Sequence, residues 1–309
     1  MLALVSEGPR RFADGLDGSA RFTVSRAPAD EAGRRAQAQR VVEHLARFEA
    51  ENNLPVGVAS ALADGSLGKD DAELLLAIDA GGESAAAVVM TPPYRLLIAY
   101  GDDPAAREVL LSDMLARGVH PPGVVGPEPT TREVAAWWAE RLALNAEPKM
   151  RQGVYRLSRV RASDRTPGTV RPAVAADASL VVPWLEAFFS EAHVDVGTPA
   201  DVFRTFVTSD YRRLFVFEVG GQPVSIAGLG ARTPRGRRIG PVYTPPEHRR
   251  KGYAESLVAQ VSASALTAGN DFCFLFTDLD NPTSNAVYER IGYERIIQSA
   301  EYDLVPPPT

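Results

Sequence analysis

The sequence predicts an α/β protein with a mixed sheet, and three observations support this prediction. Runs of strand length alternate with helical periodicity through residues 170–304, in the order β, α, β, β, β, α, β, α, β. Gly220, Gly221 and Gln222 separate two strand-like runs, as in a β-hairpin. Residues 272–276 are wholly apolar, which is typical of a strand buried on both faces.

Length and composition indicate a soluble protein with room for two domains. The chain has 309 residues, of which 45% are apolar and 23% charged. It shows no apolar run near the roughly 20 residues of a membrane helix, and its N-terminus lacks a signal-peptide pattern. The only cysteine is Cys273, so neither an intramolecular disulfide nor a cysteine-rich metal site can form. With a net charge of −6, we expect a cytoplasmic protein without metal, membrane or nucleic-acid partners.

The first half predicts an α/β unit of its own. Helical periodicity covers residues 31–52, 107–117 and 134–142, and strands are expected at 85–90, 95–100 and 154–160. The Pro- and Gly-rich residues 120–129 predict a loop, and Thr130 with Glu133 matches a capping box. Trp137 and Trp138 are expected in the core. A polar stretch with a Pro-Gly pair, residues 162–169, indicates a linker, so we expect domains at 1–161 and 168–309.

The second half gives clearer boundaries. Strands are expected at 170–173, 214–219, 223–230, 237–244, 272–276 and 293–304, and helices after Asp177, at 252–266 and at 282–291. Asp177 is placed as an N-cap. Asn281 would cap the last helix, with Pro282 at its first position and Gly292 just beyond its end.

Basic residues gather before the helix at 252–266. They are Arg232, Arg235, Arg237, Arg238, His248, Arg249, Arg250 and Lys251. A solvated charged face would explain such a run. An anion site is the alternative, because helix starts carry unpaired N–H groups and partial positive charge. Small residues at Gly252 and Ala254 would let a pyrophosphate approach the backbone closely.

Two motifs in this half resemble those of one enzyme family. Arg249-x-x-Gly252-x-Ala254 is neither a P-loop nor a dinucleotide fingerprint. It resembles the cofactor motif of the GNAT (Gcn-five-related) superfamily of N-acetyltransferases. The second motif of that superfamily, Asn-x-x-Ser/Ala-x-x-x-Tyr-x-x-x-Gly-Phe/Tyr, is similar to the stretch from Asn281 to Tyr293. The resemblance covers residues 170–304. The residues in the two motif stretches are also similar to those of a bacterial branch of predicted acetyltransferases.

The resemblance implies a mostly antiparallel GNAT sheet flanked by helices, with acetyl-CoA as co-substrate. The implied cofactor contacts are backbone pairing with pantetheine by Val242, Tyr243 and Thr244, pyrophosphate binding by Arg249, Arg250, Lys251, Gly252, Tyr253 and Ala254, and contacts near the sulfur by Asn281 and Ser284. Tyr288 would be the general acid on the CoA thiolate. A buried tyrosine with a bonded hydroxyl, and a plain helix cap at Asn281, are the structural alternatives.

The acceptor side is less defined by the sequence. An alkylamine has a pKa of about 10, so it must lose a proton before it attacks. Candidate bases are Glu186, Glu191, His193 and Asp195, in a region that faces the acceptor in the family. Glu191 is the preferred candidate. A base acting through water, with these residues as ordinary surface charges, remains open.

Two shared features are consistent with the first half being a distant copy of the second. Each half has a Thr-Pro-Pro segment and a later Tyr-x-Leu strand, at Tyr155 and at Tyr302. After the strand at 95–100, however, Asp102 and Asp103 stand where basic residues would be needed, and an acidic turn repels a pyrophosphate. A degenerate GNAT-like unit of this kind would not bind cofactor and would instead shape the acceptor pocket or a homodimer interface.

The sequence leaves three alternative functions for this protein. The first is transfer of an acetyl group from acetyl-CoA to a primary amine of a small molecule, amino acid or peptide. The second is a non-catalytic acyl-CoA sensor, which would need the 249–254 turn but no leaving-group acid. The third is a nucleotide-binding regulator, against which the missing P-loop lysine and the second motif both count.

Overall fold

The computed structural model describes residues 21–162, 166–192 and 197–308. The elements of the first half are β1 (Phe22–Arg26), α1 (Glu31–Leu45), the short 3₁₀ turn η2 (Ala46–Phe48), α2 (Asn53–Ala63), β2 (Glu73–Asp79), β3 (Ser84–Met90), β4 (Leu96–Ile98), α3 (Pro104–Ala116), β5 (Gly123–Pro127), α4 (Thr130–Leu142) and β6 (Asn145–Leu157).

The second half repeats this order of strands and α-helices. Its elements are β7 (Thr169–Pro172), η3 (Ala175–Asp177), α5 (Ala178–Ala192), α6 (Pro199–Thr208), β8 (Arg213–Val219), β9 (Gln222–Arg232), β10 (Gly236–Tyr243), η4 (Pro246–His248), α7 (Tyr253–Thr267), β11 (Phe272–Asp278), α8 (Pro282–Ile291) and β12 (Glu294–Val305). Both halves read β, α, α, β, β, β, α, β, α, β when the 3₁₀ turns are left out.

All twelve described strands form one sheet, in the order β1-β2-β3-β4-β5-β12-β6-β11-β10-β9-β8-β7. Two pairs, β4 with β5 and β10 with β11, are parallel, and the other pairs are antiparallel. The prediction of a mixed, mostly antiparallel sheet is confirmed. Corresponding strands of the two halves lie at equal distances from the centre of this order, which is the arrangement expected of two copies of one unit.

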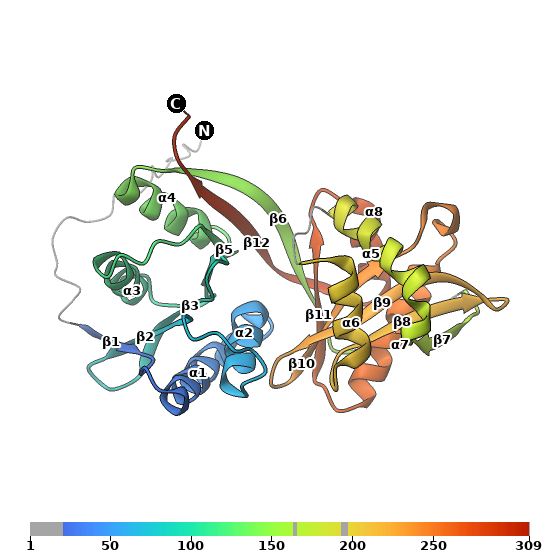
Figure 1. Cartoon of the computed structure of the whole chain (residues 1–309), viewed down its shortest axis with the longest axis horizontal. Helices are drawn as coiled ribbons and strands as arrows, with labels where there is room; N and C mark the ends of the chain where they lie inside the picture. Colours follow the sequence, from blue (N-terminus) through green and yellow to red (C-terminus); the bar gives the residue numbers. More distant parts are fainter. Residues whose placement is uncertain (1–20, 163–165, 193–196, 309) are drawn as a thin grey trace, which may run out of the picture.

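The final strands of the two halves are exchanged. β6 pairs with β11 of the second half, and β12 pairs with β5 of the first half. Between these contacts β6 and β12 pair with each other, from Arg156–Glu294 to Asn145–Val305. Figure 1 shows the two strands running side by side from one half to the other. Each half therefore completes its sheet with a strand from the other, and the boundary at 161 and 168 stays a prediction.

Each half places two pairs of helices on opposite faces of its part of the sheet. In the first half, Leu75 and Ala77 face the core under α3 and α4, whereas Leu74 and Leu76 face the core under α1 and α2. In the second half, α7 and α8 cover one face and α5 and α6 cover the other. Trp138 is fully buried in the core of the first half, as predicted.

One predicted loop is wrong. Residues 120–129 contain β5, which lies between β4 and β12. Its glycines permit close strand packing: a Cβ on Gly126 would lie 2.6 Å from the carbonyl oxygen of Ile98, and one on Gly123 would collide with the backbone of Tyr302. Composition indicated a turn where the glycines instead make room for neighbouring strands.

The single helix expected at 31–52 is also wrong. α1 ends at Leu45, and α2 begins at Asn53 after a 3₁₀ turn. The buried Asn52 holds this break, because its amide donates to Leu45 O at 3.3 Å and to Tyr100 O at 3.2 Å, and its Oδ1 accepts from Tyr100 N at 2.7 Å. A long-range contact with the end of β4 thus redirects the chain.

Two predicted caps differ as well. α4 starts at Thr130 with Pro129 at the N-cap and no side-chain cap bond, so the capping box does not form. The Asp177 carboxylate turns back to accept from Val174 N at 2.8 Å and pairs with Arg171. Asn281, Pro282 and Gly292 occupy the predicted positions around α8.

Candidate functional site

The two central parallel strands of the second half diverge. β10 and β11 pair only from Gly236–Phe272 to Arg238–Phe274, although β10 continues to Tyr243 and β11 to Asp278. Along the rest of both strands, all of it described, no further pair joins them. On their outer edges β10 stays paired with β9 and β11 with β6. The divergence leaves a gap in the backbone pairing between the two strands, here called the opening, whose unpaired backbone groups can hydrogen-bond an extended chain.

Val242 to Thr244, the predicted pantetheine contacts, lie on the β10 side of this opening. Val242 packs toward the α7 core and Tyr243 toward the α5 and α6 core. Ser225 on β9 fixes the strand end, because its hydroxyl donates to Tyr243 O at 2.9 Å and lies 2.8 Å from the Thr244 hydroxyl. The backbone edge toward β11 is thereby held in place.

The N-terminus of α7 has the form of an anion site. Gly252 occupies the N-cap with φ +76°, and no side chain caps the helix. The first bond of the helix is Ser256 N to Gly252 O, so within the described residues the N–H groups of Tyr253, Ala254 and Glu255 have no acceptor. These groups and the helix dipole attract an anion. A Cβ at Gly252 would lie 2.7 Å from Thr166 Oγ1, which donates to Lys251 O.

The three predicted cations are not equivalent. Arg249 donates to Thr244 O at 2.8 Å and to both oxygens of Glu191 at 2.8 Å. The hydrogen bond to Glu191 raises the pKa of Arg249. Lys251 donates to Glu247 O at 3.1 Å. Arg250, with φ +61°, is exposed and has no bond to another described residue.

The preferred base, Glu191, is therefore ion-paired. Its carboxylate lies at the end of α5 and holds Arg249. Glu186 is exposed on the same helix without a side-chain partner among described residues. His193 and Asp195 lie outside the described residues. The structure thus brings the Glu191 carboxylate near the end of β10, where it is ion-paired with Arg249.

The corresponding position in the first half is filled by the chain itself. Asp103 caps α3 by accepting from Ala105 N at 2.8 Å and Ala106 N at 3.0 Å. Asp102 accepts from Ala87 N at 3.0 Å and lies 2.8 Å from His44 Nε2. At α3 the Asp103 carboxylate already accepts from the N–H groups of the first turn, whereas the equivalent groups of α7 are free. The start of α3 therefore cannot offer those N–H groups to a phosphate.

The α8 motif places Ser284 and Tyr288 on one side of the helix. Asn281 Oδ1 accepts from Ser284 N at 3.1 Å, so this asparagine does cap the helix. Tyr288 packs on Tyr293, with ring centroids 5.9 Å apart, beside the α7 core. Burial raises the pKa of Tyr288 to about 12. Its hydroxyl bonds to no described residue, which leaves it available to a ligand.

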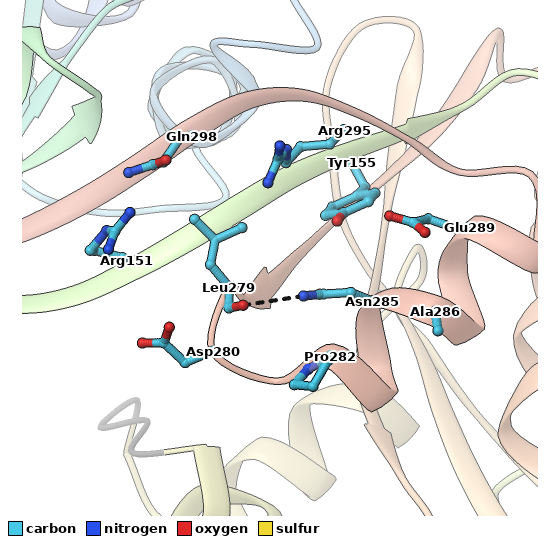
Figure 2. Close-up of a pocket in the computed structure, with 10 residues that line it drawn as sticks. All are labelled: Arg151, Tyr155, Leu279, Asp280, Pro282, Asn285, Ala286, Glu289, Arg295 and Gln298. Carbon is cyan, nitrogen blue, oxygen red and sulfur yellow. Dashed lines mark hydrogen bonds between the residues drawn. The ribbon is translucent and has the colours of Figure 1, made fainter.

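A cavity of about 630 Å³ lies on the other side of α8. Figure 2 shows Asn285 and Glu289 of α8 facing Tyr155 and Arg295 across it. Asn285 donates to Leu279 O at 3.5 Å on its wall. Residues 282, 285, 286 and 289 line it, whereas Ser284 and Tyr288 point away from it by helical spacing. This cavity is therefore separate from the predicted thiol position.

Some contacts of this site were not expected from the sequence. Thr166 lay in the presumed linker, and Ser225 within a strand without a motif. Both act through contacts distant in sequence, for which no local signal exists. Cys273 is buried, and burial raises the pKa of its thiol to about 12, as suits a core residue. In the described ranges, no group of three or more His, Cys, Asp or Glu could hold a metal, and no helix is long and apolar enough to cross a membrane.

Known proteins share this arrangement. Residues 221–302 match the family model described as FR47-like protein. The structure of a GCN5-related N-acetyltransferase from Sphaerobacter thermophilus aligns with a TM-score of 0.60 and 19% identity, over 94% of this chain and 97% of that one. This chain has a GNAT fold. The GNAT fold that the two motifs predicted is confirmed, whereas the bacterial branch stays a prediction.

Two further structures align with both halves of the chain. A tandem GNAT protein from the clavulanic acid biosynthesis pathway aligns with a TM-score of 0.55 and 14% identity, over 93% of this chain and 99% of that one. A Drosophila protein aligns with a TM-score of 0.63 and 14% identity, over 92% and 98%. No curated protein matches the sequence significantly.

Proposed function

We propose that this protein transfers an acetyl group from acetyl-CoA to an amine. One observation carries the proposal: in the second half, the opening between β10 and β11 is combined with an α7 start that has no side-chain cap. The first half lacks this combination, because Asp103 caps α3. An opening with free backbone edges suits the pantetheine arm, and three free N–H groups suit the pyrophosphate. The GNAT fold of the solved structures supports the same reading.

The chain's own residues would act as follows. Tyr253, Ala254 and Glu255 would bind the pyrophosphate through their free N–H groups, Gly252 would leave room for it, and Arg250 and Lys251 would add positive charge. Val242 to Thr244 hold the pantetheine arm in place, and Asn281 with Ser284 borders it at the start of α8. Acetyl-CoA supplies the thioester carbon that a neutral amine attacks, and the CoA thiolate leaves.

Tyr288 would stabilise that thiolate. With a pKa of about 12, its hydroxyl stays protonated at neutral pH and can donate. A thiol has a pKa of about 8.5, so complete proton transfer from this phenol to the thiolate is unfavourable by about 3.5 pKa units. We therefore assign to Tyr288 a hydrogen bond to the departing sulfur, and Tyr288 keeps its proton. The proton that the attacking nitrogen loses passes to water, and the CoA thiolate takes up a proton from solvent.

The base is assigned to water rather than to Glu191 alone. Both oxygens of the Glu191 carboxylate already accept hydrogen bonds from Arg249 at 2.8 Å. This carboxylate can still orient a water molecule at the mouth of the opening. This assignment keeps Glu191 and Arg249 as a positioning pair.

Calorimetric titration with CoA and acetyl-CoA tests the proposal. Wild type should bind both, and Gly252→Glu should lose binding because it adds bulk and negative charge at the α7 start. Gly269→Glu is the matched control, since Gly269 also has positive φ, ends the same helix and borders open space. Failure of wild type to bind either ligand rejects the proposal. Binding without thiol release for any amine favours the sensor.

A further inference from the structure

Two arginines near the opening, Arg238 and Arg212, have no acidic partner among the described residues. Arg238 on β10 is half-buried, and among the described residues its guanidinium meets no carboxylate and no hydrogen-bond acceptor. It lies over the ring of Phe276, 5.2 Å from the centroid. Arg212, just before β8, is half-buried and also has no acid partner in the described part of the chain. Burial lowers the pKa of Arg238, and the nearby charge of Arg212 acts in the same direction.

Several other arginines of this half have acid partners. Arg171 bonds Asp177 and Glu218, and Arg249 bonds Glu191. A guanidinium cannot shed its proton in a protein, and a charge withdrawn from water needs a counter-charge. Arg212 and Arg238 therefore lack a negative counter-charge, which a bound anion would supply.

The place of Arg238 relates it to the opening. The pair Arg238–Phe274 is the last contact between β10 and β11 before they diverge. Phe272 and Phe274 lie on the opposite sheet face from Cys273 and Leu275, which pack under α7. Phe276 continues that alternation. Arg238 therefore borders the opening on the face away from α7, where a second substrate can approach a thioester held from the α7 side.

The charges on that face favour an anionic ligand. Glu191 is neutralised by Arg249, whose guanidinium lies over the ring of Tyr243, 5.6 Å from the centroid. Tyr243 itself packs against α5 and α6. The charges without an acid partner beside Phe276 are thus those of Arg238 and Arg212, and the ring of Phe276 adds an apolar wall beside Arg238.

We propose that Arg238, assisted by Arg212, binds an anionic group of the acceptor, so that the acceptor is an amine carrying a carboxylate or a phosphate. This inference rests on the proposed acetyl transfer and narrows its acceptor class. The planar guanidinium holds either anion through paired N–H bonds. The amine at the other end of the molecule then reaches the opening. Simple alkylamines and polyamines, which lack the anion, are poor acceptors.

The test is a panel of matched acceptors, read by thiol release and by product mass. Glycine, β-alanine and γ-aminobutyrate are each compared with their amides, and phosphoethanolamine with ethanolamine. Wild type should favour an anionic member over its neutral match by at least about tenfold in kcat/KM, equal to about 1.4 kcal/mol. Preference within the carboxylate or the phosphate pairs identifies the anion.

Variants assign that preference to Arg238. Arg238→Gln should abolish it, mainly by raising KM for the anionic member, and Arg238→Lys should keep part of it. Arg204→Gln, which removes an exposed charge from α6, should keep all of it. CoA titration of each variant shows that the fold is intact.

The outcomes are separable. If wild type binds no CoA, both proposals fall, and calorimetry alone reveals this. If CoA binds but neutral amines are preferred, or the anionic preference survives Arg238→Gln, the acceptor proposal is overturned while acetyl transfer stands. CoA binding without transfer to any anionic member of the panel also overturns it.

Discussion

The carboxylate of Glu49 accepts a hydrogen bond from the Thr233 hydroxyl at 2.6 Å, across 184 positions of sequence. The same carboxylate accepts from Arg235 N at 2.7 Å and Arg235 Nε at 2.9 Å. Its side chain is only 1% exposed. A buried acid after α1 therefore fastens the β9–β10 turn of the second half to the first half.

Removing this acid should destabilise the protein. Glu49→Ala leaves a buried hydroxyl and a backbone N–H without an acceptor, at a cost of about 2–4 kcal/mol. Glu49→Gln, which keeps one oxygen, should cost less. Urea unfolding measures both, with the exposed Glu83→Ala as control. A Glu49→Ala variant as stable as the control would show that the contact between the halves is dispensable.

Alanine at Gly252 separates backbone strain from cofactor binding. Both Gly252 (φ +76°) and Gly269 (φ +97°) flank α7 in the left-handed region, where alanine costs about 1 kcal/mol. Both variants should lose stability in thermal unfolding, and Gly252→Ala should lose more because its methyl group would also press on Thr166. Only Gly252→Ala should weaken CoA binding, because that methyl group stands at the helix start where the pyrophosphate is proposed to bind. Equal CoA affinity in the two variants would contradict the site.

Tyr288→Phe should lower kcat by about 10²-fold or more and leave CoA affinity nearly unchanged. The hydroxyl acts on the departing thiolate, while the ring still packs on Tyr293. Because the pKa of Tyr288 is raised to about 12, wild-type kcat should show no loss from tyrosine deprotonation between about pH 7 and pH 10. A Tyr288→Phe variant with wild-type kcat would exclude the role.

Asp177 should make stability depend on pH. Its hydrogen bond from Arg171 holds the pKa of Asp177 below its usual range. A lowered folded-state pKa adds stability above the unfolded pKa of about 4, and this is lost as pH falls through the folded value. Wild type should thus lose about 1 kcal/mol more than Asp177→Asn on acidification. Urea unfolding across that range decides it, and exposed Asp210→Asn should behave as wild type.

CoA should bind once per chain. Asp103 already caps α3, so the first half offers no free helix start. Calorimetry should give a stoichiometry of about one CoA per chain. Of the two equivalent helices, α3 begins with a side-chain cap and α7 does not. Two equivalents, with the second lost in a variant of the first half, would show that this half also binds.

Much of the second half was predictable from local patterns. The two-residue glycine turn and the Asn281–Pro282–Gly292 signals fixed β8, β9 and α8. α6 was missed, although Thr198 and Asp201 flank its first turn and Thr198 accepts from Asp201 N at 3.1 Å. α2 was missed for a different reason. It contains Pro55 and Gly57, and burial of Val56 and Ala59 against the sheet stabilises it.

The site was predictable only where one segment forms it. The α7 turn and the α8 motif are local, so their spacing located the helix start and placed Tyr288 beside the core. The bond of Arg249 to Glu191 and the bare guanidinium of Arg238 arise from contacts between distant segments. Sequence spacing carries no information about which charge finds a partner.

The exchange of β6 and β12 also governs how the chain can fold during synthesis. β5 is made early, but its edge is covered only when residues 299–303 emerge. Until then a growing chain exposes an unpaired edge, which other chains can join. A cut between the halves would create the same edge permanently, and would strip β6 from β11. Neither half can therefore close its sheet before the synthesis of β12 is finished.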